Sequence, residues 1–422
     1  MAPLRRLRAI SRHLGKSDVE PSGAANAEPI PVGDDDAPAL RPSELQHFKD
    51  HGFVVAKGLL RESDFDDVIG AYDALITERA KPLLAEGLLS SLREELPFHS
   101  RLAALRNELP TERHGELTSN IDIYEAQLPE MFAFLFTKRL LAGVGSIIGD
   151  EITLSPIQHI RPFMAGTDGN MSTGPQWHMD QAVTLEEADE AEIITAWIPF
   201  VDTYPENGCL QFVDNLAPDA SWRADRSKHL VIGHHNSPHV DVRDREESPL
   251  EVPHAFLEPS GRTADDVAVT EAIMEKGDVL LFNAYVPHRG GMHSTPDSVR
   301  WSIDLRFQKT GTPTGRPHWP EFILQSPSDP SIVQDSYEEW CRRWDEGLAS
   351  PHTDLHRQPP ADAPLSIGDR VRLLGGQKGG MATVALVKEI QVSGSAGGTK
   401  YVLERMDGGD TVVATRAEVE LF

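Results

Sequence analysis

The chain has 422 residues, of which 39% are hydrophobic and 25% are charged, so it has the composition of a soluble globular protein with room for one large domain and a smaller one. Its formal net charge of −26 argues against a general nucleic-acid binder, because phosphate backbones attract the opposite charge. No stretch approaches the roughly 20 apolar residues of a membrane-spanning helix. Two distant cysteines, Cys209 and Cys341, favour a reducing compartment. We therefore expect a cytoplasmic protein without an integral membrane segment, acting on a small molecule.

Residues 1–42 are predicted to be a disordered leader. The first 16 residues carry five Lys or Arg and no acid, with leucine and isoleucine at helical spacing, so a surface-binding helix, a transit-type peptide and a mobile basic tail all remain open. Residues 17–42 are rich in Pro, Gly, Ala and Asp and cannot bury enough apolar surface to become ordered.

The ordered domain is expected from residue 43 to residue 350. "SELQHFKDHGFVVAKGLL" predicts a capped helix and a strand around Phe53 to Ala56, and a second helix follows from about Glu62. Between about Ile152 and Phe307, turn-forming residues separate the strand-like segments "EITLSPIQHIRPF", "EIITAWIPFVD", "CLQFVD", "GDVLLFNAYVPH" and "RWSIDLRFQ". Many short strands with turn signals favour a β-barrel or sandwich. A helix in "SYEEWCRRWDEGLAS" closes the domain.

The carboxyl-terminal part is predicted to be separate. Residues 351–364 are polar and proline-bearing, as linkers are, and residues 365–422 contain four or five strand-like segments joined by glycine-rich turns. A small SH3-like barrel fits this pattern. "GDRVRLLGGQKGGMATV" faintly resembles the nucleic-acid-associated KOW pattern, but seven basic residues against seven acidic ones from Ser366 onward favour a module for protein contact or self-association.

The stretch "QWHMDQAVT" places His178 and Asp180 two residues apart, so on an extended chain both side chains point the same way. A third candidate ligand, His288, ends an apolar strand in "LLFNAYVPHRGG". If a barrel brings that strand end beside the pair, two imidazoles and one carboxylate would lie on one face of a metal and leave its other positions open.

A possible anchor for a carboxylate follows twelve residues later. In "RWSIDLRF" the polar Arg300, Ser302, Asp304 and Arg306 alternate with the apolar Trp301, Ile303, Leu305 and Phe307. A polar face turned into the barrel would make Arg300 a fixed guanidinium suited to gripping a carboxylate with two hydrogen bonds. Arg306 shares that face and competes for the role.

These motifs together resemble the phytanoyl-CoA dioxygenase family of iron(II)- and 2-oxoglutarate-dependent oxygenases. The resemblance covers roughly residues 43–308 and lies in "LQHFKDHGFVVAKGLL", "PQWHMD", "TAWIPFVDTYPENGCLQFV" and "PHRGG" with "VRWSIDLRF". It implies a double-stranded β-helix core with flanking helices, His178, Asp180 and His288 as iron ligands, and Arg300 as the 2-oxoglutarate anchor.

The same resemblance implies a reaction that uses O2 and releases succinate and CO2. Hydroxylation of an aliphatic carbon in a small or medium metabolite is the expected outcome, and the carboxylate of Asp180 at a position that is small in related halogenases favours it. Desaturation, epoxidation and cyclisation at the same iron remain alternatives, as does a non-catalytic barrel acting as a ligand-binding or scaffold module.

Further candidates are less specific than the four main residues. Gln158, Arg161, Thr195 and Trp197 lie on strands expected to border the cosubstrate or substrate, and barrel packing is the competing explanation. His293 is a rival ligand. The histidines of "KHLVIGHHNSPH" (His229, His234, His235 and His239) suit a loop at the substrate entrance better than a second metal site. Residues 80–123 match no family motif, so we expect them to shape substrate choice.

Overall fold

The computed structural model describes residues 40–165, 177–213 and 268–349, together with short carboxyl-terminal stretches at 370–373, 384–391, 400–405, 411–415 and 419–421. The expectations for residues 1–39, for the linker at 351–364 and for the four histidines between 229 and 239 lie outside the described residues. What is described is mostly β-structure with packed helices, in agreement with the expected fold class.

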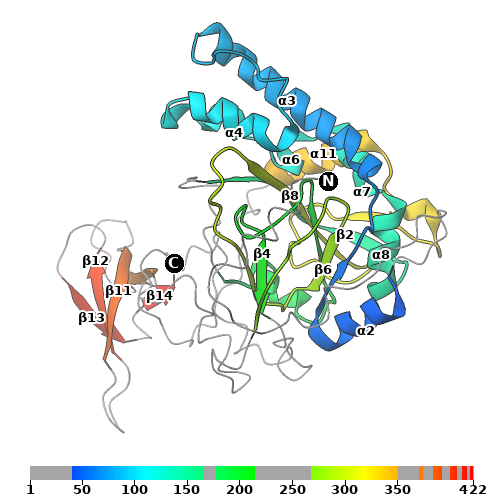
Figure 1. Cartoon of the computed structure of the whole chain (residues 1–422). Coiled ribbons are helices and arrows are strands. Elements are labelled where there is room, and N and C mark those ends of the chain that lie inside the picture. Colours follow the sequence, from blue (N-terminus) through cyan, green and yellow to red (C-terminus); the bar gives the residue numbers. More distant parts are fainter. Residues whose placement is uncertain are drawn as a thin grey trace.

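Two antiparallel sheets form the centre of the molecule (Figure 1). The large sheet has the strand order β1-β6-β3-β8-β2-β9, and the small sheet has the order β5-β4-β7. Their strands are β1 (Phe53–Ala56), β2 (Ile152–Met164), β3 (Ile194–Pro199), β4 (Leu210–Val213), β5 (Val269–Glu271), β6 (Val279–Asn283), β7 (His288–Gly290), β8 (Val299–Lys309) and β9 (Phe322–Gln325). Most neighbouring strands are distant in sequence, so the sheets bring remote motifs together.

The apolar side chains show which face of each strand is covered. Along β8, Trp301, Ile303, Leu305 and Phe307 join the core that the helices cover, so the polar residues between them face the other sheet. A second apolar cluster joins the two sheets through Phe53 of β1, Trp197 of β3 and Phe212 of β4. The expectation that the apolar face of "RWSIDLRF" packs on helices is confirmed, and its polar face lies on the opposite side of the large sheet.

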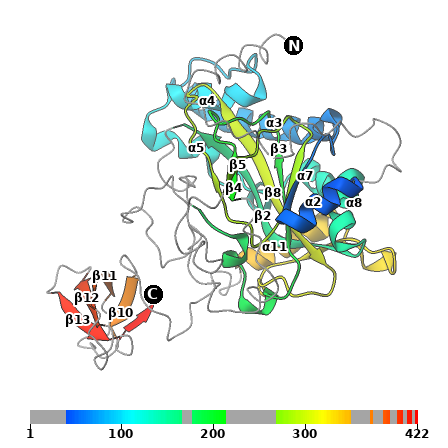
Figure 2. The same ribbon diagram turned by 60° about the horizontal axis from the view of Figure 1, so that its bottom comes forward.

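Helices cover the outer face of the large sheet (Figures 1 and 2). In α3 the buried residues Val68, Tyr72, Ile76, Ala80 and Leu83 recur at helical spacing and form its inner stripe. The α-helices of this layer and its flanks are α2 (Pro42–His51), α3 (Asp66–Ala85), α4 (Phe98–Glu108), α5 (Gly115–Thr118), α6 (Ile123–Ala126), α7 (Pro129–Leu135), α8 (Lys138–Ile148) and α11 (Tyr337–Ala349). Short 3-10 turns are η1 (Glu62–Phe65), η2 (Thr111–Arg113), η3 (Asp180–Val183), η4 (Glu186–Ala188) and η9 (Pro330–Ile332).

The expected amino-terminal elements are present, with small shifts. The helix predicted near residue 43 and the strand at Phe53 to Ala56 are found, but the helix expected from Glu62 begins with a 3-10 turn and becomes α-helical at Asp66. "GDVLLFNAYVPH" forms two strands, because Asn283 and the residues after it turn the chain between β6 and β7. Residue propensities therefore predicted where these elements lie, whereas turn-forming residues determine where they begin and end.

The carboxyl-terminal strands form a sheet of their own. Its order is β13-β12-β11-β10-β14, with every neighbouring pair antiparallel. The strands are β10 (Arg370–Leu373), β11 (Val384–Gln391), β12 (Lys400–Arg405), β13 (Val412–Thr415) and β14 (Val419–Leu421). The sequence predicted four or five strands here, and the structure has five.

Within the described residues, no single helix has the length and apolar composition needed to cross a membrane. Among the described helices, one bent pair, α7 with α8, reaches that length and composition when taken together, and both helices bury apolar side chains in the core.

Candidate active site

Two histidines from distant parts of the chain are held side by side by a backbone bridge. His178 and His288 exchange both backbone hydrogen bonds at 2.9 Å, as a hydrogen-bonded antiparallel pair does. Their side chains consequently lie on one face, with ring centroids 4.2 Å apart. His288 is further oriented by its Nδ1, which lies 3.0 Å from the carbonyl oxygen of Val286 and leaves Nε2 for a ligand.

Asp180 completes the group, although it does not lie on a strand as expected. The chain is extended at Met179 and then enters the 3-10 turn η3 at Asp180, so the predicted alternation persists over the three residues that matter. One ligand atom from each of His178, Asp180 and His288 lies within 4.8 Å of the others. The structure thus brings all three predicted ligands together.

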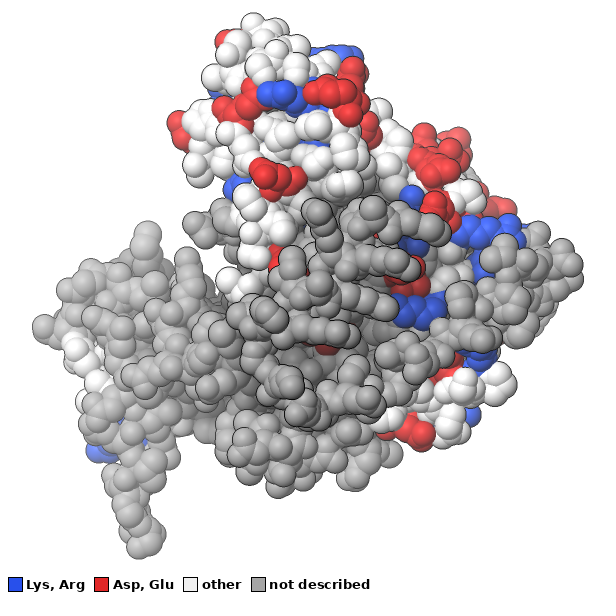
Figure 3. All heavy atoms as spheres, in the orientation of Figure 1, with Lys and Arg blue, Asp and Glu red and all other residues white. Residues whose placement is uncertain are grey.

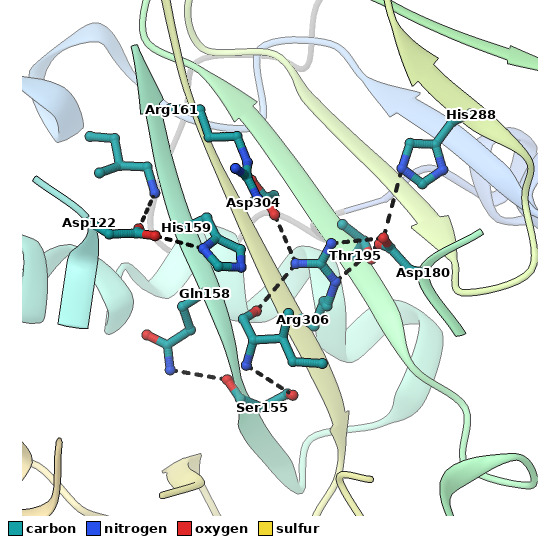
Figure 4. A network of polar contacts seen from close by, with 12 residues as sticks. Asp122, Ser155, Gln158, His159, Arg161, Asp180, Thr195, His288, Asp304 and Arg306 are labelled. Atoms are coloured by element: carbon teal, nitrogen blue, oxygen red, sulfur yellow. Dashed lines mark hydrogen bonds and ion pairs between the residues drawn. The ribbon is translucent and has the colours of Figure 1, made fainter. Parts of the chain in front are cut away.

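The carboxylate of Asp180 is held by residues on two neighbouring strands (Figure 4). The hydroxyl of Thr195 donates to Oδ2 at 2.5 Å, and Arg306 donates from Nε to Oδ2 at 3.1 Å and from Nη2 to Oδ1 at 2.8 Å. These contacts follow from the register, because Thr195 lies directly opposite Arg306 where β3 pairs with β8. Thr195 was predicted to border the cosubstrate, and its contact in the structure is with the candidate ligand.

Asp180 is ionised in this environment. Burial by itself would raise the pKa of Asp180, but the guanidinium of Arg306 and the imidazole of His288 outweigh it and hold that pKa well below its usual range. A deprotonated carboxylate beside two imidazoles is a donor set that suits a divalent transition metal such as iron(II). The residues therefore fit a metal with three protein ligands and free coordination positions.

A chain of charged side chains continues from Asp180 through Arg306 and Asp304 to Arg161 (Figure 4). Arg306 also donates to Asp304 at 2.8 Å, and Asp304 lies 3.4 Å from the Nε of Arg161 on β2. Burial would raise the pKa of Asp304, but Arg161 and Arg306 lower it to about 2. Arg306 is thus engaged at both ends by carboxylates, which leaves it poorly suited to anchor a ligand.

Arg300, unlike Arg306, has no carboxylate partner among the described residues. It is 3% exposed, and its Nη1 donates to the carbonyl oxygen of Gly208 at 2.9 Å, while its Nε finds no partner among the described residues. The guanidinium lies over the rings of Phe163 and Trp197, at 4.7 Å and 5.4 Å from their centroids. Burial lowers the pKa of Arg300 to about 10, so the group stays charged at neutral pH. A buried cation with an unpaired donor fits an anionic ligand.

The other two predicted cosubstrate contacts fall on opposite faces of the large sheet. Trp197 lies opposite Asp304 and faces the interior with Arg300. Gln158 lies opposite Leu305, so its side chain is on the helix-covered face, where its amide nitrogen donates to the carbonyl of Ser155. Leu154 and Ile160, which have the same parity along β2 as Gln158, also lie in the helix-covered core.

His293, the rival ligand, lies apart from the metal group. Its ring packs edge-on against Phe163 at 5.4 Å, and Nδ1 contacts the hydroxyl of Thr295 at 3.3 Å. The turn at Asn207 and Gly208 was expected from the sequence, but its role was not: Gly208 carries the carbonyl that accepts the hydrogen bond from Arg300. The signal was present in "PENGC", because an Asn-Gly pair between strands marks a tight turn.

Comparison with known protein families gives one match. The family model for phytanoyl-CoA dioxygenase matches residues 48–301, more than half of the chain. No curated protein matches the chain.

Several solved structures are similar at low identity. The epimerase SnoN from nogalamycin biosynthesis, described as α-ketoglutarate dependent, is 17% identical over 69% of this chain and 92% of its own, with a TM-score of 0.36. The non-heme monooxygenase ThoJ is 14% identical over 72% and 97%, with a TM-score of 0.37. HygX from Streptomyces hygroscopicus, with nickel and 2-oxoglutarate bound, is 14% identical over 64% and 88%, with a TM-score of 0.34. Because the sequence identities and TM-scores are this low, similarity to these structures establishes neither the fold nor the reaction of this chain.

Proposed function

Since this chain belongs to the phytanoyl-CoA dioxygenase family of iron(II)- and 2-oxoglutarate-dependent oxygenases, we propose that it hydroxylates an aliphatic carbon of a small or medium metabolite. The observation that carries the proposal is the convergence of His178, Asp180 and His288 on one point. Iron(II) held there would, with 2-oxoglutarate, supply O2-dependent oxidation coupled to release of succinate and CO2. Desaturation, epoxidation and cyclisation use the same residues and are separated from hydroxylation by the product.

In this proposal, residues of the chain bind the metal and hold 2-oxoglutarate beside it. His178, Asp180 and His288 hold the metal on one face, and the backbone bridge between the histidines fixes their spacing. Arg300 receives the distal carboxylate of 2-oxoglutarate, since its guanidinium lies over the rings of Phe163 and Trp197 and its buried Nε has no hydrogen-bond partner among the described residues. Arg306 is excluded from this role by its two carboxylate partners. Trp197 forms a wall of the cosubstrate pocket.

The core is proposed to be a double-stranded β-helix between residues 43 and 350. Its support is the pairing order: β2, β8, β3 and β6 lie side by side in the large sheet, and His178 bridges to β7, which pairs with β4 and then β5. Two facing four-membered layers of this kind close around the metal site.

Substrate choice is proposed to depend on residues 80–123. Phe98 at the start of α4 stacks on Trp301 at 4.7 Å, next to Arg300 in sequence. At the other end of α4, Asn107 donates to the carbonyl of Pro296 and Arg106 reaches the carbonyl of Ala165. This helix therefore lies against the strand ends that carry the proposed cosubstrate anchor.

The carboxyl-terminal residues 365–422 are proposed to form an SH3-like barrel for protein contact or self-association. The strand order supports this, since the last strand, β14, pairs with the first, β10, and the other three follow as a meander. A register shift in β11 between Val387 and Glu389 provides the bend that such a barrel needs.

The proposed partner is a small molecule, without nucleic acid and without insertion into a membrane, and the proposed location is the cytoplasm. On the face shown in Figure 3, basic side chains of the described residues are scattered among acidic ones and form no continuous basic surface. Both cysteines are free thiols, as expected in a reducing compartment.

The test adds iron(II) and 2-oxoglutarate to the metal-free protein without oxygen and measures the visible charge-transfer band of the chelated complex. The wild type should give the band, His178→Ala should not, and Arg300→Ala should need much more 2-oxoglutarate to reach it. A wild type without the band, and with no more bound iron than His178→Ala, would leave the non-catalytic ligand-binding module as the better explanation.

A further inference from the structure

Two polar side chains flank the ring of Phe163 at one end of the barrel interior. Arg300 lies directly opposite Phe163 where β8 pairs with β2, and its guanidinium lies over the ring. The imidazole of His293 packs against the same ring at 5.4 Å, with the ring planes inclined by 65°. The cation and the imidazole therefore share one aromatic neighbour.

A tight turn ties these two residues together. Asn207 forms an isolated antiparallel bridge with His293, and the next residue, Gly208, accepts the hydrogen bond from Arg300. Gly208 has φ +73°, and a Cβ there would lie 2.6 Å from the ring of Phe163 and 2.9 Å from the carbonyl of Gly291. Glycine at this position therefore allows the turn to pack closely against the ring of Phe163.

Each of the two side chains has a buried nitrogen without a partner. His293 is 8% exposed and Arg300 is 3% exposed, and neither the Nε2 of His293 nor the Nε of Arg300 has a hydrogen-bond partner among the described residues. A buried polar atom left unsatisfied is costly, and most such atoms in proteins are paired. Two in one corner indicate a ligand with acceptor atoms.

The contacts of His293 suit it to donate from Nε2. Thr295 contacts both the Nδ1 of His293 and the hydroxyl of Ser298, at 3.3 Å and 2.6 Å. When Thr295 accepts from Ser298 and donates to Nδ1, the neutral ring carries its proton on Nε2. Burial, and then the charge of Arg300, lower the pKa of His293 to about 4, so the ring is neutral at pH 7 before an anion binds.

We propose that His293 is a second hydrogen-bond donor to the distal carboxylate of 2-oxoglutarate, acting with Arg300 on the carboxylate's two oxygens. The inference rests on the proposed function and adds to it a residue that the metal site does not contain. A carboxylate has two oxygens to satisfy, and one donor on β8 with another on the segment between β7 and β8 holds it in one orientation.

The experiment uses the full chain loaded with zinc(II) and measures 2-oxoglutarate binding by calorimetry, so that no turnover is needed. The comparison ligand is 2-oxopentanoate, which has a methyl group in place of the distal carboxylate. The variants are His293→Leu, which removes the donor, and His293→Gln, whose amide can place a donor near the position of Nε2.

His293→Leu should weaken 2-oxoglutarate binding by about tenfold or more, the loss expected for one hydrogen bond to a charged group, and leave 2-oxopentanoate binding unchanged. His293→Gln should recover most of the affinity. Equal weakening of both ligands by His293→Leu, or no weakening of either, would overturn the assignment. A wild type that binds zinc(II) but no 2-oxoglutarate would instead contradict the proposed function, and circular dichroism of each variant identifies misfolding.

Discussion

At the scale of single residues, the position of the Asp180 carboxylate depends on its hydrogen-bond partners. Thr195 contributes one neutral hydrogen bond to Oδ2, so removing that hydroxyl tests positioning without changing charge. We expect Thr195→Val to weaken manganese(II) binding to the metal-free protein about tenfold, since groups that orient metal ligands carry effects of that size. Thr195→Ser retains the hydroxyl and should bind nearly as the wild type does. Calorimetry that finds Val and Ser alike would show that Arg306 alone suffices.

Asp304 provides a prediction of pH dependence at the same scale. Its pKa is about 2 in the folded protein, below the unfolded value of about 3.9, so its ionisation stabilises the fold at pH above about 4. That contribution, of the order of 2 kcal/mol, is lost as the pH falls from about 4 to about 2. Asp304→Asn should therefore be less stable than the wild type by a constant amount from pH 7 to about 4, and the difference should shrink below that. Urea unfolding across this range measures it; a gap that stays constant at pH 3 would contradict the ion pairs.

At the scale of elements, β8 carries the site on one face and the core on the other. Trp301 is fully buried, stacks on Phe98 of α4 and lies near Tyr72 of α3, so it joins the helical layer to the strand of Arg300. Trp301→Ala should cost about 3–5 kcal/mol of unfolding free energy because it leaves a large cavity. Trp301→Phe should cost less. Chemical denaturation measures both, and a cost for Ala below that for Phe would show that this contact does not hold the helices.

At the scale of the whole molecule, the carboxyl-terminal sheet pairs only with its own strands among those described. We therefore expect residues 365–422, expressed alone, to fold, and a chain ending at residue 350 to bind iron(II) and 2-oxoglutarate with unchanged affinity. Circular dichroism of the short fragment and the charge-transfer band of the long one test the two halves of the prediction. A truncated chain that loses the band would show that the tail supports the site.

The sequence by itself determined the family, the metal group and the polar face of β8. These signals are local, since a His-x-Asp pair, an Asn-Gly turn and strict alternation in "RWSIDLRF" each depend on neighbouring residues. What lies across strands was decided only by the tertiary structure. The register places Arg306 on Asp180 and leaves the Nε of Arg300 without a hydrogen-bond partner among the described residues. This distinguishes two arginines that lie on the same face of β8.

The difference between local signals and contacts across strands also explains the positions of Gln158 and His293. Gln158 lies on the helix-covered face because it pairs with Leu305 of β8, and a bridge to Asn207 brings His293 against Phe163 beside Arg300. Both depend on pairings between segments far apart in the chain, whose register follows from packing the two sheets face to face. Residue types and short spacings therefore identified the chemistry, whereas the partner of each charged group was set by long-range register.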